Sequence, residues 1–253
     1  MGHIRTFAEK LSRNRVFLRY LPGDLSAAPI YVSPDASLSH WNPRLESDLF
    51  NLARQFVHPG DTVWDIGANV GLFTIAAAQK AGPQGSVVAI EPDIWLASLL
   101  QRSALAQRPD AAPINIFPVA VAKAVGLETF HIANRNRASN HLASVPEHSQ
   151  AGGIRETRQV LSITLDWLLD HTSDQTPPTL VKIDVEGAEI DLLLGAHRLL
   201  TEVRPILMCE SQHRNRPATT TIFQRYGYKL YDWNANPRVE VQTAAFNTLA
   251  IPA

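Results

Sequence analysis

Short apolar runs alternate with stretches of helical spacing along most of this chain, and the alternation predicts a repeated order of strand and helix. Apolar runs bounded by turn residues predict strands over 62–66, 85–90, 114–119, 180–184 and 205–210. Apolar residues at helical spacing predict helices over 42–57, 71–81, 93–107, 188–200 and 219–226. Asn42 suits the first helix as its cap, and Pro43 suits its first position. Because strands joined by helices pair in parallel, the pattern predicts an α/β fold.

The two ends of the chain depart from this alternation. Near the start, two short predicted strands, 15–20 and 30–32, flank a turn at Pro22-Gly23-Asp24. Near the end, the predicted strands 229–232 and 248–251 have no helix between them. We therefore expect the last two strands to pair antiparallel and to close an otherwise parallel sheet.

A polar insertion interrupts the alternation in the middle of the chain. Residues 127–132 and 158–163 predict an antiparallel pair of strands, separated by a long polar stretch. Such a stretch is uncommon inside a compact domain and indicates a functional lid or local disorder. We expect an N-terminal β extension over 1–41 and one domain over 42–253, with residues 133–156 as a lid.

Composition narrows the classes of protein that fit this pattern. The 253 residues are 45% hydrophobic and 19% charged, and the formal net charge of -1 provides no general attraction for nucleic acid. The single cysteine, Cys209, excludes an internal disulfide, and no apolar stretch approaches the ~20 residues of a membrane span. The first 20 residues are basic but lack the apolar centre of a signal peptide. We expect a cytoplasmic protein that binds neither nucleic acid nor a membrane; the pattern does not determine its oligomeric state.

The junction of the first predicted strand and helix of the alternation carries two glycines, in the segment VWDIGANVGLFTIAAAQ. Gly67 and Gly71 permit a tight turn at the carboxyl end of the strand, where α/β proteins bind ligands. A dinucleotide site places a third glycine between them, but this chain has Asn69. Asp65, two residues before the turn, would repel a pyrophosphate and attract a cation. S-adenosylmethionine carries a sulfonium, an ammonium and no phosphate, and it therefore fits this turn better.

A second carboxylate follows the next predicted strand, in VVAIEPD. Glu91 is placed to accept hydrogen bonds from two ribose hydroxyls. This interaction serves a nicotinamide dinucleotide and S-adenosylmethionine equally, so Glu91 alone does not separate the two ligands. Together with Asp65 and Asn69, Glu91 favours a binding site for S-adenosylmethionine over the alternative, a tight turn that binds no ligand.

A third junction, in LVKIDVEGAEIDLLLGA, places Asp184 and Glu186 at the end of a buried strand. In the usual strand order of methyltransferases this strand lies beside the first, which would bring Asp184 near the transferred methyl group. Glu189 can stabilise the start of the following helix through the helix dipole, and Lys182 can offset part of the negative charge. A capped helix with solvated acids is the alternative interpretation.

These segments together resemble one family. DIGANVG with AIEPD, followed by LDWLL and KIDVEGAE, is similar to the FkbM-type S-adenosylmethionine-dependent methyltransferases, over roughly residues 46–231. The resemblance implies a class I methyltransferase fold, a Rossmann-like three-layer sandwich, and O-methylation of a sugar, polyketide or related small-molecule or glycan acceptor. It implies cofactor contacts from Asp65, Gly67, Asn69, Gly71 and Glu91, and from Ala120 near the adenine. It also implies that Asp184 and Glu186 face the site of methyl transfer.

The next predicted strand end, MCESQHR, supplies candidates for the catalytic base. His213 is the first candidate, because an alcohol acceptor needs a base and histidine titrates near neutral pH. Glu210 is placed to orient His213 or to bind the acceptor. His141, in the polar insertion, becomes a second candidate if the insertion folds over the pocket. Carboxylates on adjacent strand ends also permit a metal site, but no ligand spacing demands one, so we expect none.

Three other functions remain open. An acidic pocket also suits an N-methyltransferase, and a chain with this fold can bind S-adenosylmethionine without catalysis. A nicotinamide-dependent dehydrogenase is disfavoured by Asn69, by Asp65 and by the antiparallel end of the sheet.

Trp233 is either a core residue or a platform for the acceptor, and the sequence does not distinguish these roles.

Overall fold

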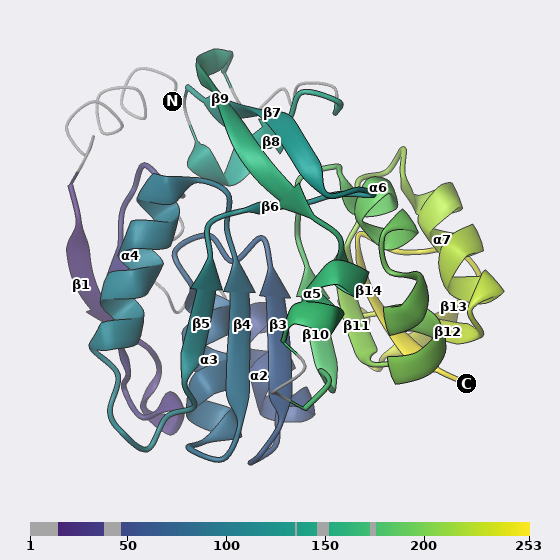
Figure 1. The fold of residues 1–253 in the computed structure, drawn as a ribbon. Helices are drawn as coiled ribbons and strands as arrows, with labels where there is room; N and C mark the ends of the chain where they lie inside the picture. The colour runs from purple at the N-terminus through teal and green to yellow at the C-terminus, as the bar shows by residue number, and fades with distance from the viewer. Residues whose placement is uncertain (1–14, 38–46, 135, 146–151, 173–175) are drawn as a thin grey trace.

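A central sheet of eight strands forms the framework of the computed structural model (Figure 1). The structure describes residues 15–37, 47–134, 136–145, 152–172 and 176–253. The strands of the sheet are β3 (Thr62–Ile66), β4 (Ser86–Ile90), β5 (Ile114–Phe117), β10 (Leu180–Ile183), β11 (Ile206–Glu210), β12 (Tyr228–Asp232), β13 (Val239–Val241) and β14 (Asn247–Pro252). Their order across the sheet is β13-β12-β14-β11-β10-β3-β4-β5. This is the expected α/β architecture of a class I methyltransferase.

Neighbouring strands from β5 to β11 are parallel, and the C-terminal part is antiparallel, as predicted. β10 lies directly beside β3, which brings the ends of the first and third junctions together. β14 is antiparallel to both β12 and β11, so the last strand inserts between its predicted partner and the parallel part of the sheet. The short strand β13 was not predicted.

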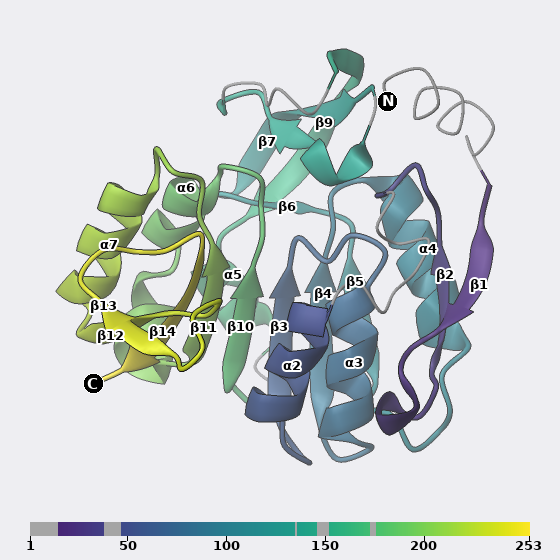
Figure 2. The ribbon, with the colours of Figure 1, turned by 180° about the vertical axis from the view of Figure 1, so that it is seen from behind.

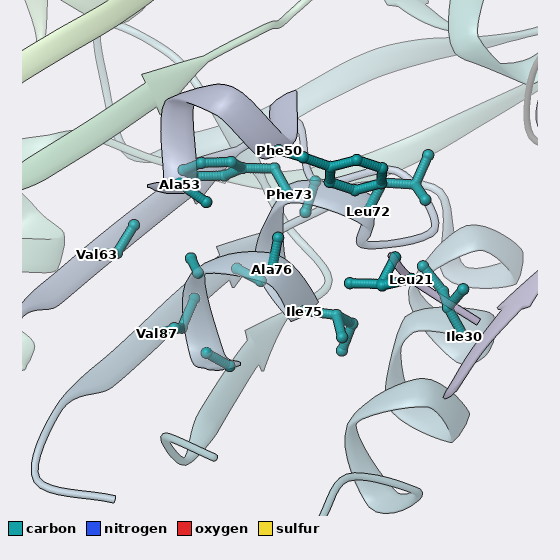
Figure 3. Close-up of a cluster of buried hydrophobic side chains, with 14 of the residues drawn as sticks. Leu21, Ile30, Phe50, Ala53, Val63, Leu72, Phe73, Ile75, Ala76 and Val87 are labelled. Atoms are coloured by element: carbon teal, nitrogen blue, oxygen red, sulfur yellow. The ribbon is translucent and has the colours of Figure 1, made fainter. Parts of the chain in front are cut away.

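Helices cover both faces of the sheet (Figures 1 and 2). They are α2 (Ser47–Phe56), α3 (Leu72–Ala81), α4 (Ile94–Leu105), α5 (Leu165–His171), α6 (Glu189–Leu194) and α7 (Arg216–Arg225). Side chains of a strand alternate between the two faces. Val63 accordingly packs with α2 and α3 in one core (Figure 3), while the adjacent Trp64 packs with α5, α6 and α7 in the other. Burial on both faces explains why the parallel strands are mostly apolar, and the buried charges of Asp65 in β3 and Lys182 in β10 are paired with each other.

Several predicted boundaries differ from the structure by two residues or more. The helix predicted over 188–200 is interrupted: α6 ends before Gly195, and a π-helical turn, Leu199–Val203, follows. A Cβ at Gly195 would lie 2.6 Å from the carbonyl oxygen of Ala122, so the chain turns where another backbone passes closely. The strand predicted over 114–119 ends at Phe117. α7 begins at Arg216, three residues earlier than predicted, with a proline in its first turn.

The N-terminal hairpin packs against α4. β1 (Phe17–Tyr20) and β2 (Pro29–Val32) pair antiparallel, as predicted. The backbone N–H of Tyr31 donates to Ser103 Oγ at 2.9 Å, and Ile30 belongs to the same core as α3. The hairpin therefore has no separate core. The proposed boundary at residue 41 and the expected helix cap at Asn42 lie outside the described residues.

The polar insertion belongs to a second, four-stranded sheet. Its strands are β6 (Ala120–Val121), β7 (Gly126–Ala133), β8 (His141–Leu142) and β9 (Ile154–Ile163), in the order β6-β9-β7-β8. β7 and β9 form the predicted antiparallel pair. Figure 1 shows this sheet over the carboxyl ends of β3, β4 and β5, where the glycine turn and Glu91 lie. The insertion is thus placed to cover a ligand at those strand ends.

Candidate active site

The turn between β3 and α3 has a backbone that requires its two glycines. Gly67 and Gly71 have φ values of +79° and +91°, and Asn69 between them has +53°. A Cβ on Gly67 would lie 1.8 Å from the carbonyl oxygen of Asp184, and one on Gly71 would lie 2.2 Å from Leu100 Cδ1. Gly67 therefore permits the loop after β10 to approach the turn, and Gly71 permits α4 to pack on it.

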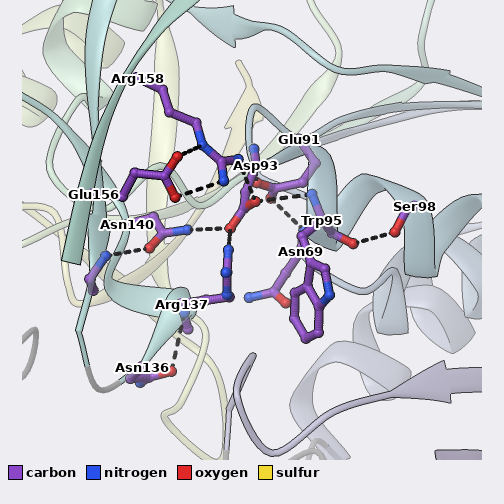
Figure 4. A network of polar contacts seen from close by, with 12 residues as sticks. Asn69, Glu91, Asp93, Trp95, Ser98, Asn136, Arg137, Asn140, Glu156 and Arg158 are labelled. Carbon is purple, nitrogen blue, oxygen red and sulfur yellow. Dashed lines mark hydrogen bonds and ion pairs between the residues drawn. The ribbon is translucent and has the colours of Figure 1, made fainter. Parts of the chain in front are cut away.

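Glu91 joins this turn to the loop after β4 (Figure 4). Its Oε2 accepts from the backbone N–H of Asn69 at 2.9 Å, and its Oε1 accepts from that of Asp93 at 2.8 Å. Burial raises the pKa of Glu91 to about 8 although both hydrogen bonds lower it. Each oxygen of a carboxylate has room for a second donor, so Glu91 can hold two further hydroxyls.

A pocket, the main pocket, opens at these strand ends beneath the insertion. The space between its walls, including the part open to solvent, is about 650 Å³. Six residues predicted for the site line it: Gly67, Asn69, Glu91, Ala120, Asp184 and Glu186. The pocket also takes wall residues from the insertion, including Arg137 and His141.

Asp65 lies beneath this pocket rather than in its wall. The side chain is 0% exposed, and it accepts from Thr74 Oγ1 at 2.5 Å and from Lys182 Nζ at 3.2 Å. The residues lining the main pocket do not include Asp65 or Gly71. Asp65 therefore fixes the position of Lys182 and balances its charge, and the direct contact with a cofactor expected from the sequence stays a prediction.

Lys182 links Asp65 to the loop after β10. Its Nζ lies 3.5 Å from the carboxylate of Asp184, on the other side from Asp65. Burial lowers the pKa of Lys182, but these two carboxylates outweigh it and raise the pKa above the ordinary value. The ammonium group stays charged, and its charge is balanced within the protein.

The loop after β10 is strained where it carries Glu186. Glu186 has a φ of +51°, unusual for a residue other than glycine, and Gly187 has +103°. Burial and the nearby charges of Asp184 and Glu210 raise the pKa of Glu186 to about 9. Three carboxyl groups thus lie close enough to interact at the junction of β10 and β11, and Glu186 keeps its proton at neutral pH.

Hydrogen bonds from α6 and the loop before α7 hold this strained loop. Glu189 Oε1 accepts from the backbone N–H of Gly187 at 2.7 Å. Asn215 donates to Glu189 Oε2 at 2.5 Å and to the carbonyl oxygen of Gly187 at 2.9 Å. Glu189, expected only to favour the helix dipole, therefore fixes the conformation that presents Glu186 to the pocket.

A second opening, the acidic cleft, adjoins the main pocket on the side of β11. Its lining includes Asp48, Leu49, Lys182, Asp184, Glu210, Trp233 and Asn247. A connecting pocket shares Asp184 and Glu186 with the main pocket, and shares Asp184 and Glu210 with the acidic cleft. Asp184 lines all three openings. It therefore stands where two ligands bound in neighbouring openings would meet.

Of the two histidines considered as bases, the structure brings His141 to the main pocket but not His213. His213 is exposed and lies outside the linings of these three openings. His141 is only 2% exposed, lines the main pocket and lies with Nδ1 3.0 Å from the carbonyl oxygen of Ser139. An N–H at Nδ1 donates there, which leaves Nε2 as the acceptor nitrogen. His148 lies outside the described residues.

Sequence reasoning missed the residue that ties the insertion to the central domain. Asp93 is fully buried and caps α4 by accepting from the backbone N–H of Trp95 at 3.0 Å. It also forms an ion pair with Arg137, accepts from Asn140 Nδ2 at 2.9 Å and lies 3.6 Å from Arg158 (Figure 4). These three partners come from the insertion sheet. The position of Asp93 as a helix cap two residues after Glu91 was a signal in the sequence, but nothing in the sequence indicated its partners in the insertion.

Arg137 has one further unusual feature. The side chain is 7% exposed, and its Cζ lies 4.7 Å from the centre of the Trp95 ring. Within the described residues its Nε has no hydrogen-bond partner. A buried N–H without a partner is costly, so Arg137 presents an unused donor in the wall of the main pocket.

Comparison with known proteins identifies the family. The family model described as "Methyltransferase FkbM domain" matches residues 65–230, well over half of the chain. The chain belongs to the FkbM methyltransferase family. It is 25% identical over 169 residues to the hexuronic acid methyltransferase AglP of Haloferax volcanii, covering 65% of this chain and 62% of that protein.

Other similar proteins are more distant or much longer. The chain is 27% identical over 211 residues to the AMB antimetabolite synthetase AmbE of Pseudomonas aeruginosa, covering 68% of this chain but only 10% of that protein. Among solved structures, an FkbM methyltransferase from Methylobacillus flagellatus is 16% identical with a TM-score of 0.48, covering 79% of this chain and 50% of that one. This chain thus spans less than two thirds of each of the two curated relatives.

Two further properties bear on function. Among the described residues, no group of three or more histidine, cysteine, aspartate and glutamate side chains is arranged to hold a metal ion. Over the same part of the chain, no helix is both long and apolar enough to cross a membrane.

Proposed function

We propose that this methyltransferase uses S-adenosylmethionine and transfers the methyl group to a hydroxyl of a small sugar-like acceptor. The observation that carries the proposal is the junction of the main pocket with the acidic cleft, where Asp184 and Glu210 surround Glu186. A sulfonium bound there gains attraction from these carboxylates, and the neutral thioether product loses it. The site therefore favours the donor over the product.

The main pocket suits the nucleoside part of the donor. Glu91 offers two acceptor oxygens for a ribose diol, and Ala120 lies in the same pocket wall. When bound, S-adenosylmethionine supplies an electrophilic methyl group. The acceptor oxygen attacks the methyl carbon, the carbon–sulfur bond breaks with its electron pair passing to sulfur, and a base takes the hydroxyl proton.

Glu210 is the proposed base. Glu186 is protonated at neutral pH, Asp184 is paired with Lys182, and His213 lies outside the cleft. Glu210 ends β11 and lines both the connecting pocket and the acidic cleft. This choice replaces His213, whose exposed position removes the argument for it.

One relative and the charge of the cleft bear on the acceptor. AglP is named a hexuronic acid methyltransferase, which supports a sugar hydroxyl as the acceptor class. The acidic cleft also favours an amine, so N-methylation is the second candidate. A panel of sugars and amines with labelled methyl donor separates the two, because the label goes to oxygen or to nitrogen in the isolated product.

A calorimetric experiment tests the cofactor proposal directly. A cationic ligand near Glu186 lowers the pKa of that group from about 9 and releases its proton. At pH 8, S-adenosylmethionine should release up to about one proton on binding, measured as a difference between buffers of different ionisation enthalpy. S-adenosylhomocysteine should release much less, and NAD should not bind. Equal proton release with both sulfur ligands would contradict the role of the carboxylates.

A further inference from the structure

The lining of the acidic cleft combines apolar side chains with acidic and amide groups. It lies where the start of α2 and the ends of β10, β11 and β12 come together. Leu49 and Met208 supply apolar surface, and Asp48, Glu210 and Asn247 supply oxygen and amide groups. A small number of polar groups on an apolar wall is the usual construction of a small-molecule site.

Trp233 forms one wall of this cleft and is held in place from outside it. Its ring centre lies 6.0 Å from that of Phe56, and the Arg238 guanidinium lies 4.8 Å from it. The backbone N–H of Trp233 donates to the carbonyl oxygen of Asn247 at 3.0 Å, which joins the two lining residues. Arg238 also donates to Gln55 at 2.6 Å and is not itself part of the lining. The indole is therefore a fixed surface on which a ligand ring can lie.

The charge of the cleft is negative. Among the residues that the structure describes, Asp48, Asp184 and Glu210 contribute three carboxylates to the lining, and Lys182 contributes one ammonium group. That ammonium is 3.2 Å from the buried carboxylate of Asp65, which balances its charge. A ligand with its own carboxylate would be repelled by the three lining carboxylates, and within the same described residues the lining offers it no arginine as a bidentate partner.

We infer that the acidic cleft is the acceptor subsite and that it takes an uncharged sugar ring, stacked on Trp233 with its hydroxyls toward Glu210, Asn247 and Asp48. The inference rests on the proposed function and makes it more specific. It also separates this chain from a methyltransferase that acts on a uronic acid. The connecting pocket, through Asp184 and Glu210, leads from this subsite to the proposed donor site.

Matched acceptors test the charge argument. Methyl hexopyranosides and the corresponding methyl hexopyranosiduronates, which differ in one carboxylate, are offered to the full chain with labelled S-adenosylmethionine. The neutral member of the productive pair should have a kcat/KM at least roughly tenfold higher, as expected for repulsion at a partly solvated site. A preference for the uronate would overturn the inference.

Two variants locate the effect in this cleft. Asp48→Asn should raise kcat/KM for the uronate several-fold relative to the neutral sugar, because it removes one repelling charge. Trp233→Ala should raise KM for the sugar at least roughly tenfold with little change in the Kd of S-adenosylhomocysteine. Glu202→Gln, a surface change outside the cleft lining, is the matched control and should alter neither ratio. Unchanged kinetics in both cleft variants would place the acceptor elsewhere.

Cofactor binding separates this inference from the proposed function. If S-adenosylhomocysteine does not bind, the proposed function fails and this inference fails with it. If it binds and only amines or other non-sugar acceptors are methylated, the donor assignment stands and the sugar subsite is overturned. If it binds and no sugar of either charge is methylated, the sugar subsite is overturned in the same way.

Discussion

Single residues at the strand ends do two tasks at once, and Glu91 is the clearest case. Its two oxygens satisfy the backbone N–H groups of Asn69 and Asp93, which belong to separate loops. The same oxygens face the main pocket. A change at Glu91 therefore affects ligand binding and the positions of both loops.

Glu91→Ala should weaken binding of S-adenosylhomocysteine by about ten- to hundredfold and lower the free energy of unfolding by about 1–3 kcal/mol, since two buried N–H groups lose their partner. Isothermal calorimetry and denaturant titration measure the two effects. Glu202→Ala, at an exposed position, is the control. Wild-type affinity in a folded Glu91→Ala protein would remove Glu91 from the cofactor site.

The choice of base is also made at single residues. Glu210→Gln should lower kcat by about 10²–10⁴-fold with little change in cofactor affinity, because a general base acts only in the transition state. His213→Ala should stay within a few-fold of wild-type activity, since His213 lies outside the openings. Steady-state kinetics of both variants decide the matter. A large loss in His213→Ala alone would restore the sequence-based assignment.

At the scale of elements, a buried carboxylate, that of Asp93, joins the insertion to the central domain. Asp93 caps α4 and at the same time binds Arg137 and Asn140 of the insertion. Arg137 and His141, from the same short segment, line the main pocket. The insertion therefore covers the main pocket, where we propose that the nucleoside binds, and its closure on a ligand as a lid stays a prediction.

Asp93→Asn should loosen this attachment. It leaves the charge of Arg137 buried without a partner carboxylate, and breaking a buried ion pair typically costs about 3–5 kcal/mol. Hydrogen exchange in β7, β8 and β9 should accelerate, while exchange in α3 should stay unchanged, and cofactor affinity should fall. Asp110→Asn, which breaks an exposed pair with Arg108, is the matched control. Unchanged exchange in the insertion would show that Asp93 does not hold it.

The elements themselves were largely predictable, and the reason is their burial. β3, β4 and β10 are mostly apolar and buried on both faces, and the turns after β3 and β10 carry the glycines that close contacts require. The local hydrophobic pattern is sufficient to predict these strands. It failed to predict the end of α6 at Gly195, because the backbone of Ala122, from a distant part of the chain, passes close to that glycine.

The same distinction applies to the site. Residues that follow a predicted strand, such as Glu91 and Asp184, were found because strand ends meet at one edge of a parallel sheet. Arg137 was missed because it lies in a polar insertion without periodicity, and its partner Asp93 is 44 residues away. His213 was overestimated because sequence proximity to β11 does not determine whether a loop residue turns toward the pocket or the solvent.

At the scale of the whole molecule, the raised pKa values of three carboxyl groups, those of Glu91, Glu186 and Glu189, make stability depend on pH. The pKa of Glu91 is raised to about 8 and that of Glu186 to about 9, in both cases chiefly by burial. In the unfolded chain both groups titrate near 4.5, the ordinary value. Between the ordinary pKa of 4.5 and the raised values, these carboxyl groups are ionised in the unfolded chain and protonated in the folded chain. Unfolding therefore releases protons, and the stability of the protein falls as pH rises.

The melting temperature of the ligand-free protein should therefore be higher at pH 6 than at pH 9. The carboxyls whose pKa is lowered, Asp24 and Glu156, titrate below this window, and Tyr228, whose pKa is raised to about 12, titrates above it. Scanning calorimetry at constant ionic strength measures the slope. The double variant Glu91→Gln/Glu186→Gln should flatten it, because neither amide ionises. A melting temperature that rises from pH 6 to pH 9 would show that these two carboxyls do not dominate the pH dependence of stability.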